Sequence, residues 1–340
     1  MAILDNGILS ISSQSSGGRG KMQQQSSKEA GKGDGKPGEP GGSEQGEQHQ
    51  GTEEAAPQQD GGLWARIQDG CSFVDENFRF SPWLFASNPH GTQMANLICA
   101  IDPFCQIYVA RVAEDSSKIT PKRVAKAIKW ARSLDVDVIS MSFAMGHSDS
   151  DLEDELREAT KQGIVMTCSA HDEGSRISKA YPADLRSDLL SLLVLAACDE
   201  YGKLLRDLSP NKYDYMIRGQ NIAAGVIDFL KSEDVITGSS VSTALAAGLC
   251  SLILTCDRLA HPGKRYPGGK EAGSRWALVR RHLEKMAADD SKQFLLLEKF
   301  ENIATPHINQ PTAEEIELAA SGIGERSAKA VLMEEFGMLA

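Results

Sequence analysis

Apolar and polar residues follow two patterns along most of this chain, and the two patterns alternate. Short runs that are almost wholly apolar are typical of strands buried on both faces, whereas apolar residues three and four positions apart are typical of helices. The pattern predicts strands at 105–112, 136–143, 164–170 and the latter part of 189–200. It predicts helices at 90–101, 120–134, 150–163, 239–254 and 273–288, and a strand or short helix at 294–303.

Local signals mark two of the helix ends. Thr120 is the expected N-cap of one helix, with Pro121 in its first turn, and Gly163 is the expected end of the next helix. Strands separated by helices imply a parallel sheet with helices on both faces, so the expected fold class is α/β. In such sheets ligands bind beyond the carboxyl ends of the strands. The residues expected there are His90, 143–146, 170–174 and Ser240.

The first residues stand apart from the rest of the pattern. MAILDNGILSI is apolar and strand-like, but from Ser12 to Gly62 there is no Val, Leu, Ile, Phe, Tyr or Trp. Such a segment cannot bury enough apolar area to offset its ordering entropy, so we expect a disordered insertion. The predicted division is a first strand at 1–11, the insertion at 12–62, the main domain at 63–290 and a mostly helical extension at 291–340.

Bulk composition narrows the classes of function. The 340 residues carry a net charge of −11, which argues against a general nucleic-acid or anionic-membrane surface. No apolar run reaches the roughly 18–20 residues that cross a bilayer, and the first residues lack a secretory signal. The seven Cys form no CxxC pairs, and we expect small buried residues in a reducing setting. The expected location is cytoplasmic or otherwise intracellular, with secretion left open for a chain truncated at its N-terminus.

Three separated segments carry residue types that cooperate in nucleophilic catalysis. Asp5 follows an apolar strand, while His90 and Ser240 each stand at the start of a predicted helix. A serine nucleophile needs a neighbouring base, and that base needs a carboxylate to orient it. A helix N-terminus adds backbone N–H groups that favour developing negative charge. Each residue alone also fits a structural role, as a turn residue, a helix-start residue or an N-cap.

The motifs around these residues resemble the three active-site segments of the subtilisin-like serine protease family, the subtilases (peptidase family S8). Asp5-Asn6-Gly7 resembles the D-[ST]-G segment, and HGTQMA at 90–95 matches the H-G-T-x-x-A segment. GSSVSTALAAG at 238–248 resembles the G-T-S-x-A-T-P-x-x-A-G segment, and the order Asp, His, Ser is that of the family. The resemblance covers residues 1–10 and about 63–290. It implies a three-layer subtilisin-like fold.

The resemblance implies a role for each residue of the site. Asp5 would orient His90, His90 would be the general base, and Ser240 would be the nucleophile of a serine endopeptidase that works through an acyl-enzyme. A cleft strand would bind a peptide or protein substrate as an added strand. The residues of that strand are Ser140, Met141, Ser142, Phe143, Ala144 and Gly146. His147 and His171 match no triad position and are expected on the surface or along the cleft.

One position departs from the family pattern in a way that bears on activity. Asp172 stands where the family has the Asn of the oxyanion hole, and His171 stands where it has Gly. An ionised carboxylate would repel the oxyanion, and loss of one oxyanion donor lowers the rate about 10²–10³-fold. The alternative to an active protease is therefore a catalytically impaired subtilase-fold module that binds peptides or regulates a partner.

Other kinds of site fit the chain less well. Calcium often stabilises subtilases, but no ligand set can be matched here, so no cofactor is assigned. SGIGERSAKAV at 321–331 resembles a helix-hairpin-helix, yet glutamates surround it and oppose a phosphate partner. Ser240 lacks the second Gly of an α/β-hydrolase elbow, and no G-x-G-x-x-G follows a strand. We therefore expect no nucleic-acid, dinucleotide or membrane partner.

Overall fold

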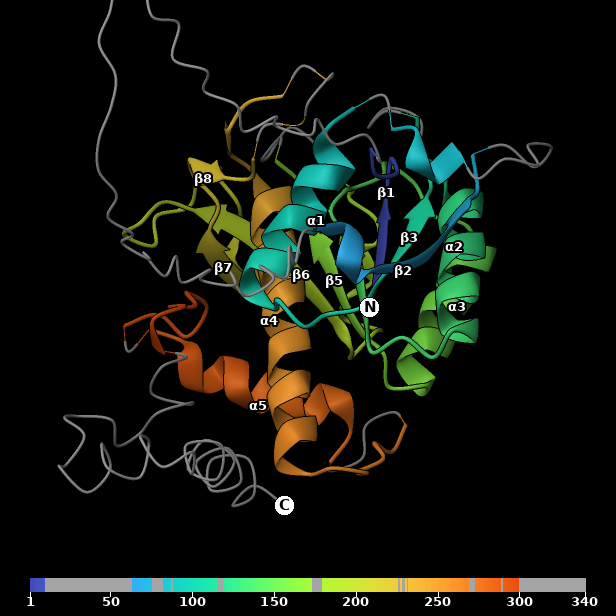
Figure 1. Cartoon of the computed structure of the whole chain (residues 1–340). Helices are drawn as coiled ribbons and strands as arrows, with labels where there is room; N and C mark the ends of the chain where they lie inside the picture. Colours follow the sequence, from blue (N-terminus) through green and yellow to red (C-terminus); the bar gives the residue numbers. More distant parts are fainter. Residues whose placement is uncertain are drawn as a thin grey trace, which may run out of the picture. The chain divides into compact units, whose positions relative to one another are not determined.

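Seven short strands, all parallel to their neighbours, form the sheet at the centre of the fold (Figure 1). The computed structural model describes residues 1–9, 63–74, 82–86, 88–114, 119–172, 179–225, 227, 230, 232–268, 273–288 and 290–299. The strand order is β2-β3-β1-β4-β5-β6-β7. The strands are β1 (Ala2–Asp5), β2 (Ile67–Ser72), β3 (Ile107–Arg111), β4 (Val138–Met141), β5 (Val165–Ser169), β6 (Leu192–Cys198) and β7 (Tyr215–Arg218).

The strand at the start of the chain lies inside the sheet. β1 pairs with β3 on one side, where Asp5 lies opposite Arg111, and with β4 on the other, where Leu4 lies opposite Met141. All four residues of β1 are buried, and their side chains alternate between the two faces of the sheet. The strand ends at Asp5, so this carboxylate lies at the carboxyl edge of the sheet, where ligands bind in such folds.

Helices cover both faces of the sheet, and the α/β prediction is confirmed. The helices are α1 (His90–Ile101), α2 (Pro121–Ser133), α3 (Ser150–Lys161), α4 (Ser239–Ala260) and α5 (Arg275–Met286). α1, α4 and α5 share one buried apolar cluster with Ile3, whereas α2 and α3 share another with Leu4. Figure 1 shows α1 and α4 in front of the strands, with α2 and α3 at the right. A short antiparallel pair, β8 (Ile222–Ala223) and β9 (Val235–Ile236), stands outside the sheet.

The helix ends predicted at Thr120 and Gly163 agree with the structure, and the predicted element at 294–303 is described only in part. Thr120 Oγ1 accepts the backbone N–H of Arg123 at the start of α2, and Gly163 has a φ of 73° just after the end of α3. The run at 294–303 was expected to be a strand or short helix; residues 294–298 form two isolated bridges and a turn, Lys299 is helical, and 300–303 lie outside the described residues. The two apolar residues Phe294 and Leu295 make isolated bridges to Met216 and Ala287, because they pack against two separate elements.

The longest helix corrects the expectation that no apolar run is long enough to cross a bilayer. α4 has 22 residues, and the mean hydropathy of its most apolar 18-residue window is 1.6. Of that window, 78% is buried inside the fold. Packing against the sheet and α1 explains this apolarity, since the helix is in the core and not on the surface.

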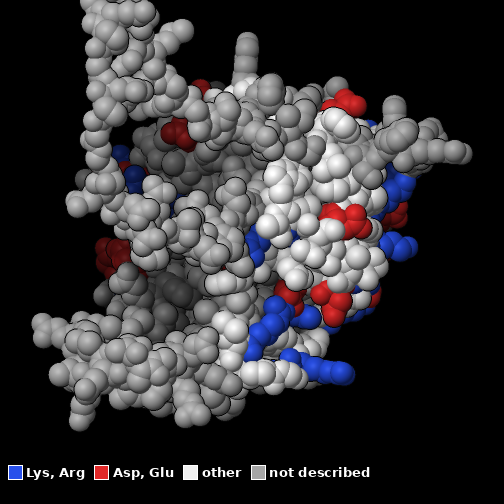
Figure 2. Space-filling view, in the orientation of Figure 1, with Lys and Arg blue, Asp and Glu red and all other residues white. Residues whose placement is uncertain are grey.

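Side chains of both charge signs are interspersed on the described part of the face in Figure 2. Several form ion pairs on or between helices, such as Arg157 with Glu153 and Arg132 with Glu155. The Arg157–Glu153 pair is largely exposed, and exposed pairs contribute about 0–1 kcal/mol, so it adds little to stability. The Arg132–Glu155 pair is more buried, with side chains 16% and 20% exposed. Among the described residues, no group of three or more His, Cys, Asp or Glu is arranged to hold a metal ion. The predicted insertion at 12–62 and the motif at 321–331 lie outside the described residues.

Candidate active site

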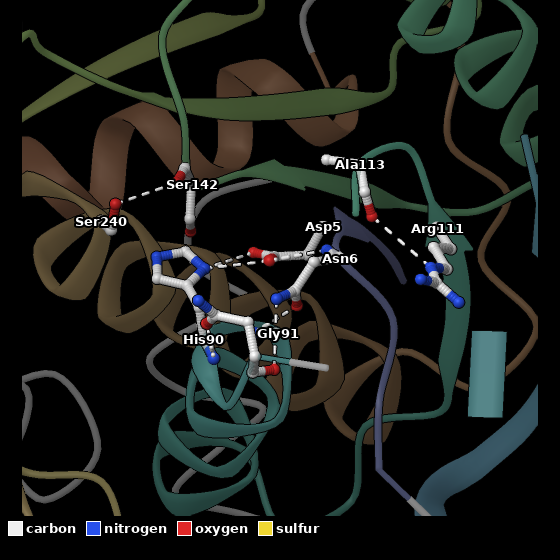
Figure 3. A network of polar contacts seen from close by, with 9 residues as sticks. Asp5, Asn6, His90, Gly91, Arg111, Ala113, Ser142 and Ser240 are labelled. Atoms are coloured by element: carbon white, nitrogen blue, oxygen red, sulfur yellow. Dashed lines mark hydrogen bonds and ion pairs between the residues drawn. The ribbon is translucent and has the colours of Figure 1, made fainter. Parts of the chain in front are cut away.

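Asp5 and His90 are 85 residues apart in the sequence and in direct contact in the fold. His90 Nδ1 lies 2.9 Å from Asp5 Oδ1 and 3.0 Å from Oδ2 (Figure 3). A carboxylate only accepts hydrogen bonds, so Nδ1 is the donor and Nε2 of the neutral ring is left as an acceptor. The Asp5 side chain is 7% exposed and that of His90 is 38% exposed. This is the arrangement that a general base requires.

Two opposing effects set the pKa of His90. Burial disfavours the charged imidazolium and lowers the pKa, while the charge of Asp5 and its hydrogen bond both raise it. The two effects of Asp5 together prevail, so the pKa of His90 lies above its ordinary value of about 6.5. Asp5 therefore stabilises the protonated form of His90, the form that exists after it has accepted a proton.

The residues after His90 hold the first turn of α1 against the end of β1. A Cβ at Gly91 would lie 2.3 Å from the carbonyl oxygen of Gly7, so any other residue would push the two elements apart. Thr92 Oγ1 accepts the backbone N–H of Leu9 at 3.0 Å. Each residue of the HGT motif therefore has its own role. His90 contacts Asp5, Gly91 allows α1 to approach Gly7 closely, and Thr92 accepts the N–H of Leu9.

Ser240 lies in the first turn of α4 and faces the same cavity as His90. The helix begins after Gly238, which has a φ of 150°, a conformation that other residues rarely adopt. Ser240 Oγ donates to the carbonyl oxygen of Ser142 at 2.8 Å, and no described hydrogen bond joins it to His90. In Figure 3 the imidazole lies between the Asp5 carboxylate and the Ser240 side chain. Rotation about Cα–Cβ would turn the hydroxyl from Ser142 toward the ring.

Asp172 holds the backbone that leads into Ser240. The N–H of Ser239 donates to both carboxylate oxygens, at 3.1 Å and 3.0 Å, and Ser239 Oγ donates to the Ala170 carbonyl oxygen at 2.6 Å. In this structure Asp172 is therefore an acceptor that anchors the start of α4. It also lines the cavity, so its carboxylate lies close to where negative charge would develop.

A cavity of about 280 Å³ brings most of the predicted residues together. Its lining includes the predicted Asp5, His90, Ser142, Phe143, Ala144, His171, Asp172 and Ser240. Ser140 and Met141 do not line it, because they lie inside β4 with a strand on each side. Gly146 and His147 are exposed and lie outside the lining.

Other lining residues were not predicted. They are Asn6, Asn88, Ala113, Ile119, Ser169 and Ser239, whereas Ala170 was expected at this end of the sheet. Asn6 belongs to the Asp5-Asn6-Gly7 motif, so its position next to Asp5 could have predicted that it lies at the site. Ala113 and Ile119 follow β3 in a loop without any motif, and only the strand order brings them to the cavity.

Comparisons with known proteins agree with this geometry. A model of the subtilase family matches residues 84–289, more than half of the 340 residues. The subtilisin-like protease het-Q2 of Podospora anserina is 28% identical over 184 residues, covering 48% of each chain. Subtilisin E of Bacillus subtilis (strain 168) is 26% identical over 201 residues, covering 56% of this chain and 51% of that one. The chain thus spans about half the length of these two curated relatives.

Solved structures share the fold. The structure of the prenylagaramide maturation protease PagA matches with a TM-score of 0.52 and 18% identity, over 69% of this chain and 95% of that one. The self-cleaved protease domain of PatA matches with a TM-score of 0.53 and 17% identity, over 70% and 88%. At identities this low, the matches show a shared arrangement of sheet and helices and nothing further.

Proposed function

This chain belongs to the subtilase family of proteases, and on that premise we propose that it is a serine endopeptidase with Asp5, His90 and Ser240 as its triad. The observation that carries the proposal is the contact between Asp5 and His90 at 2.9 Å, made in a cavity that Ser240 also lines. The order of the three residues in the chain is the order found in subtilisins.

Hydrolysis would begin with the proton of the Ser240 hydroxyl. His90 Nε2 takes this proton as Oγ attacks the scissile carbonyl carbon, and Asp5 stabilises the resulting imidazolium. The imidazolium then gives the proton to the leaving amine, which leaves an acyl group on Ser240. Water, activated by the same imidazole, releases the acid and restores the hydroxyl. In the first turn of α4 the Ser239 N–H donates to Asp172, and the Val241 and Ser242 N–H groups donate to the Gly238 carbonyl oxygen. The Ser240 N–H is therefore the first-turn donor that would stabilise the oxyanion.

The substrate would be a peptide or protein segment in extended form. The backbone at 142–144 lines the cavity, and the carbonyl oxygen of Ser142 accepts the Ser240 hydroxyl. A substrate N–H that bound this carbonyl oxygen, as an added strand would, takes the place of that hydroxyl. Ser240 would then be released toward His90. Substrate binding and activation of the nucleophile are linked in this way.

A fluorophosphonate probe tests the proposal, because it reacts with serines that a neighbouring base has activated. We expect one label per chain on the wild type, located at Ser240 by mass spectrometry, and no label on Ser240→Ala. Ser239→Ala is the matched control: it removes the adjacent hydroxyl, which bonds to Ala170, and should still be labelled. A wild-type chain that is folded by circular dichroism yet takes up no label would contradict the proposal.

A second candidate function is that of an impaired peptide-binding module, and Asp172 is the observation that favours it. Its carboxylate lines the cavity and accepts the Ser239 N–H, whereas an oxyanion needs a donor. Asp172→Asn keeps an acceptor for Ser239 and adds an N–H donor. We expect this change to raise kcat for peptide hydrolysis about 10²–10³-fold if the native site is impaired by the missing donor.

Asp172→Ala separates the two causes, because it removes the charge and adds no donor. If kcat rises in Asp172→Asn but not in Asp172→Ala, the missing hydrogen-bond donor limits the native site. If kcat rises equally in both variants, repulsion by the carboxylate charge limits it. If Asp172→Asn is no faster than the wild type, the impaired-site explanation is wrong. Progress curves with a panel of peptides at fixed pH measure all three chains.

A further inference from the structure

Asn6 is joined through its side-chain amide to the two residues that flank the turn carrying His90. Its Nδ2 donates to the carbonyl oxygen of Asn88 at 3.1 Å. Its Oδ1 accepts the N–H of Gly91 at 2.9 Å (Figure 3). Asn6 is 5% exposed. One buried amide therefore bridges the end of β1 and both sides of His90.

The same residue also contacts the carboxylate that orients His90. The backbone N–H of Asn6 donates to Asp5 Oδ1 at 2.8 Å, the oxygen that lies 2.9 Å from His90 Nδ1. Asn6 thus contacts Asp5 through its backbone N–H, and it contacts the segment that carries His90 through its side chain. A change in its side chain alone should alter the distance between the two.

The first turn of α1 depends on this contact from another element. Pro89, at the N-cap of α1, makes no side-chain capping hydrogen bond, and proline has no N–H of its own. The Gly91 N–H is a first-turn donor without an acceptor inside the helix, and Asn6 supplies its acceptor. The start of α1 is therefore held from the residue after β1, in addition to a local bond in which Asn88 Oδ1 accepts the His90 N–H at 2.9 Å. His90 is the first residue of that helix.

We propose that Asn6 is a positioning residue of this site, whose side-chain amide sets the place of His90 relative to Asp5. It acts through the Asp5–His90 pair and does not touch the substrate. Asn can do this because its amide has a donor and an acceptor at the end of one side chain, and both are used here. The proposal rests on the proposed triad for its effect on rate, but its effect on His90 can be measured without any rate.

The test uses Asn6→Ala in the full chain, with two readouts. We expect kcat to fall about 10–100-fold while KM changes less than threefold, because a displacement of about 1 Å in catalytic geometry is enough for such a loss. In NMR titrations we expect the pKa of His90 to move down, since Asp5 is less well placed to raise it. The His90 signal is assigned from its absence in His90→Gln. The other titratable residues that line the cavity, His171 and Asp172, are both still present in this variant.

Ser274→Ala is the matched control for loss of a buried cap. Ser274 accepts the Ala277 N–H at the start of α5, far along the chain from the triad, and it is fully buried. Its replacement should lower Tm comparably and leave kcat and the His90 titration unchanged. Asn6→Ala combined with Asp5→Asn should be little slower than Asp5→Asn alone, since Asn6 acts through that pair.

The outcomes separate this proposal from the proposed function. A folded Asn6→Ala chain whose His90 titrates as in the wild type overturns the positioning role and leaves the protease proposal untouched. A wild-type chain that hydrolyses nothing, with a His90 titration that shifts in Asn6→Ala, supports the positioning role while the protease proposal fails. Full additivity of the two changes would also overturn the positioning role.

Discussion

Replacement of His90 by alanine should lower kcat for peptide hydrolysis about 10⁶-fold, the size of the loss measured for the base of a subtilisin. In the proposed mechanism His90 takes the Ser240 proton, and among the described residues it is the base that both contacts Asp5 and lines the cavity with Ser240. Without it the hydroxyl must lose its proton to water, so the remaining rate comes from substrate binding and from the oxyanion donors. Initial rates with a fluorogenic peptide, followed over hours for the variant, measure the loss.

His147→Ala is the natural comparison for this change. His147 lies close to the predicted cleft strand, but it is exposed and lies outside the cavity lining. Its replacement should leave kcat within about twofold of the wild type. A loss of less than tenfold in His90→Ala, in protein whose Tm is close to that of the wild type, would exclude His90 as the base.

Asp5→Asn should lower kcat about 10⁴-fold and move the acid limb of the pH profile. His90 must be neutral to accept a proton, so kcat/KM falls as pH falls through its pKa. In the wild type Asp5 raises that pKa, which places the acid limb above about pH 6.5. Asparagine removes the charge that raises the pKa and leaves burial, which lowers it. The limb of the variant should therefore lie below about pH 6.5, and the ratio of wild-type to variant activity should be smallest in acid.

Profiles of kcat/KM between about pH 4 and 9 for both chains check this. Asp290→Asn, an exposed change of the same kind after α5, should leave both the rate and the limb in place. If the acid limb of kcat/KM lies at the same pH in Asp5→Asn as in the wild type, this limb reflects the titration of a group other than His90.

The sequence was most informative where a short motif and its local structure coincide. The segment at 90–95 predicted both a helix start and a residue with a role in the site, and the structure places His90 at the first position of α1. The core strands β3 to β6 were predicted because they are apolar on both faces. Local composition is enough to recognise elements of this kind.

Elements without such a signal were missed. β2 is a strand of mixed exposure with the polar sequence IQDGCS, and β7, with the sequence YMIR, ends in an exposed arginine. β2 is paired on one side alone, to β3, so its sequence is not held to the apolar composition of a central strand. The hairpin of β8 and β9 has two residues in each strand, too few for a periodic pattern.

The site shows a similar division between what is local and what is not. The bond from Ser240 to Ser142, and the anchoring of Ser239 by Asp172, join residues 98 and 67 positions apart. Contacts between residues so far apart in the sequence depend on the order of the strands in the sheet. No single segment of the sequence therefore predicts them. For the same reason Ser140 and Met141 were assigned to the cleft, while the pairing of β4 with β1 and β5 buries both.

The place of β1 between β3 and β4 determines when the proposed triad can be complete during folding. The first residue of the chain already bonds to Gln106, 105 positions away, so insertion of this strand closes a long loop. Contacts between residues so far apart form slowly, because the entropy of loop closure is lost before the contacts stabilise the chain. A partly folded chain in which β1 is not yet inserted has Ser240 and His90 but no Asp5 beside them. With the proposed triad, peptide cleavage by a given chain would therefore begin only after its own sheet closes.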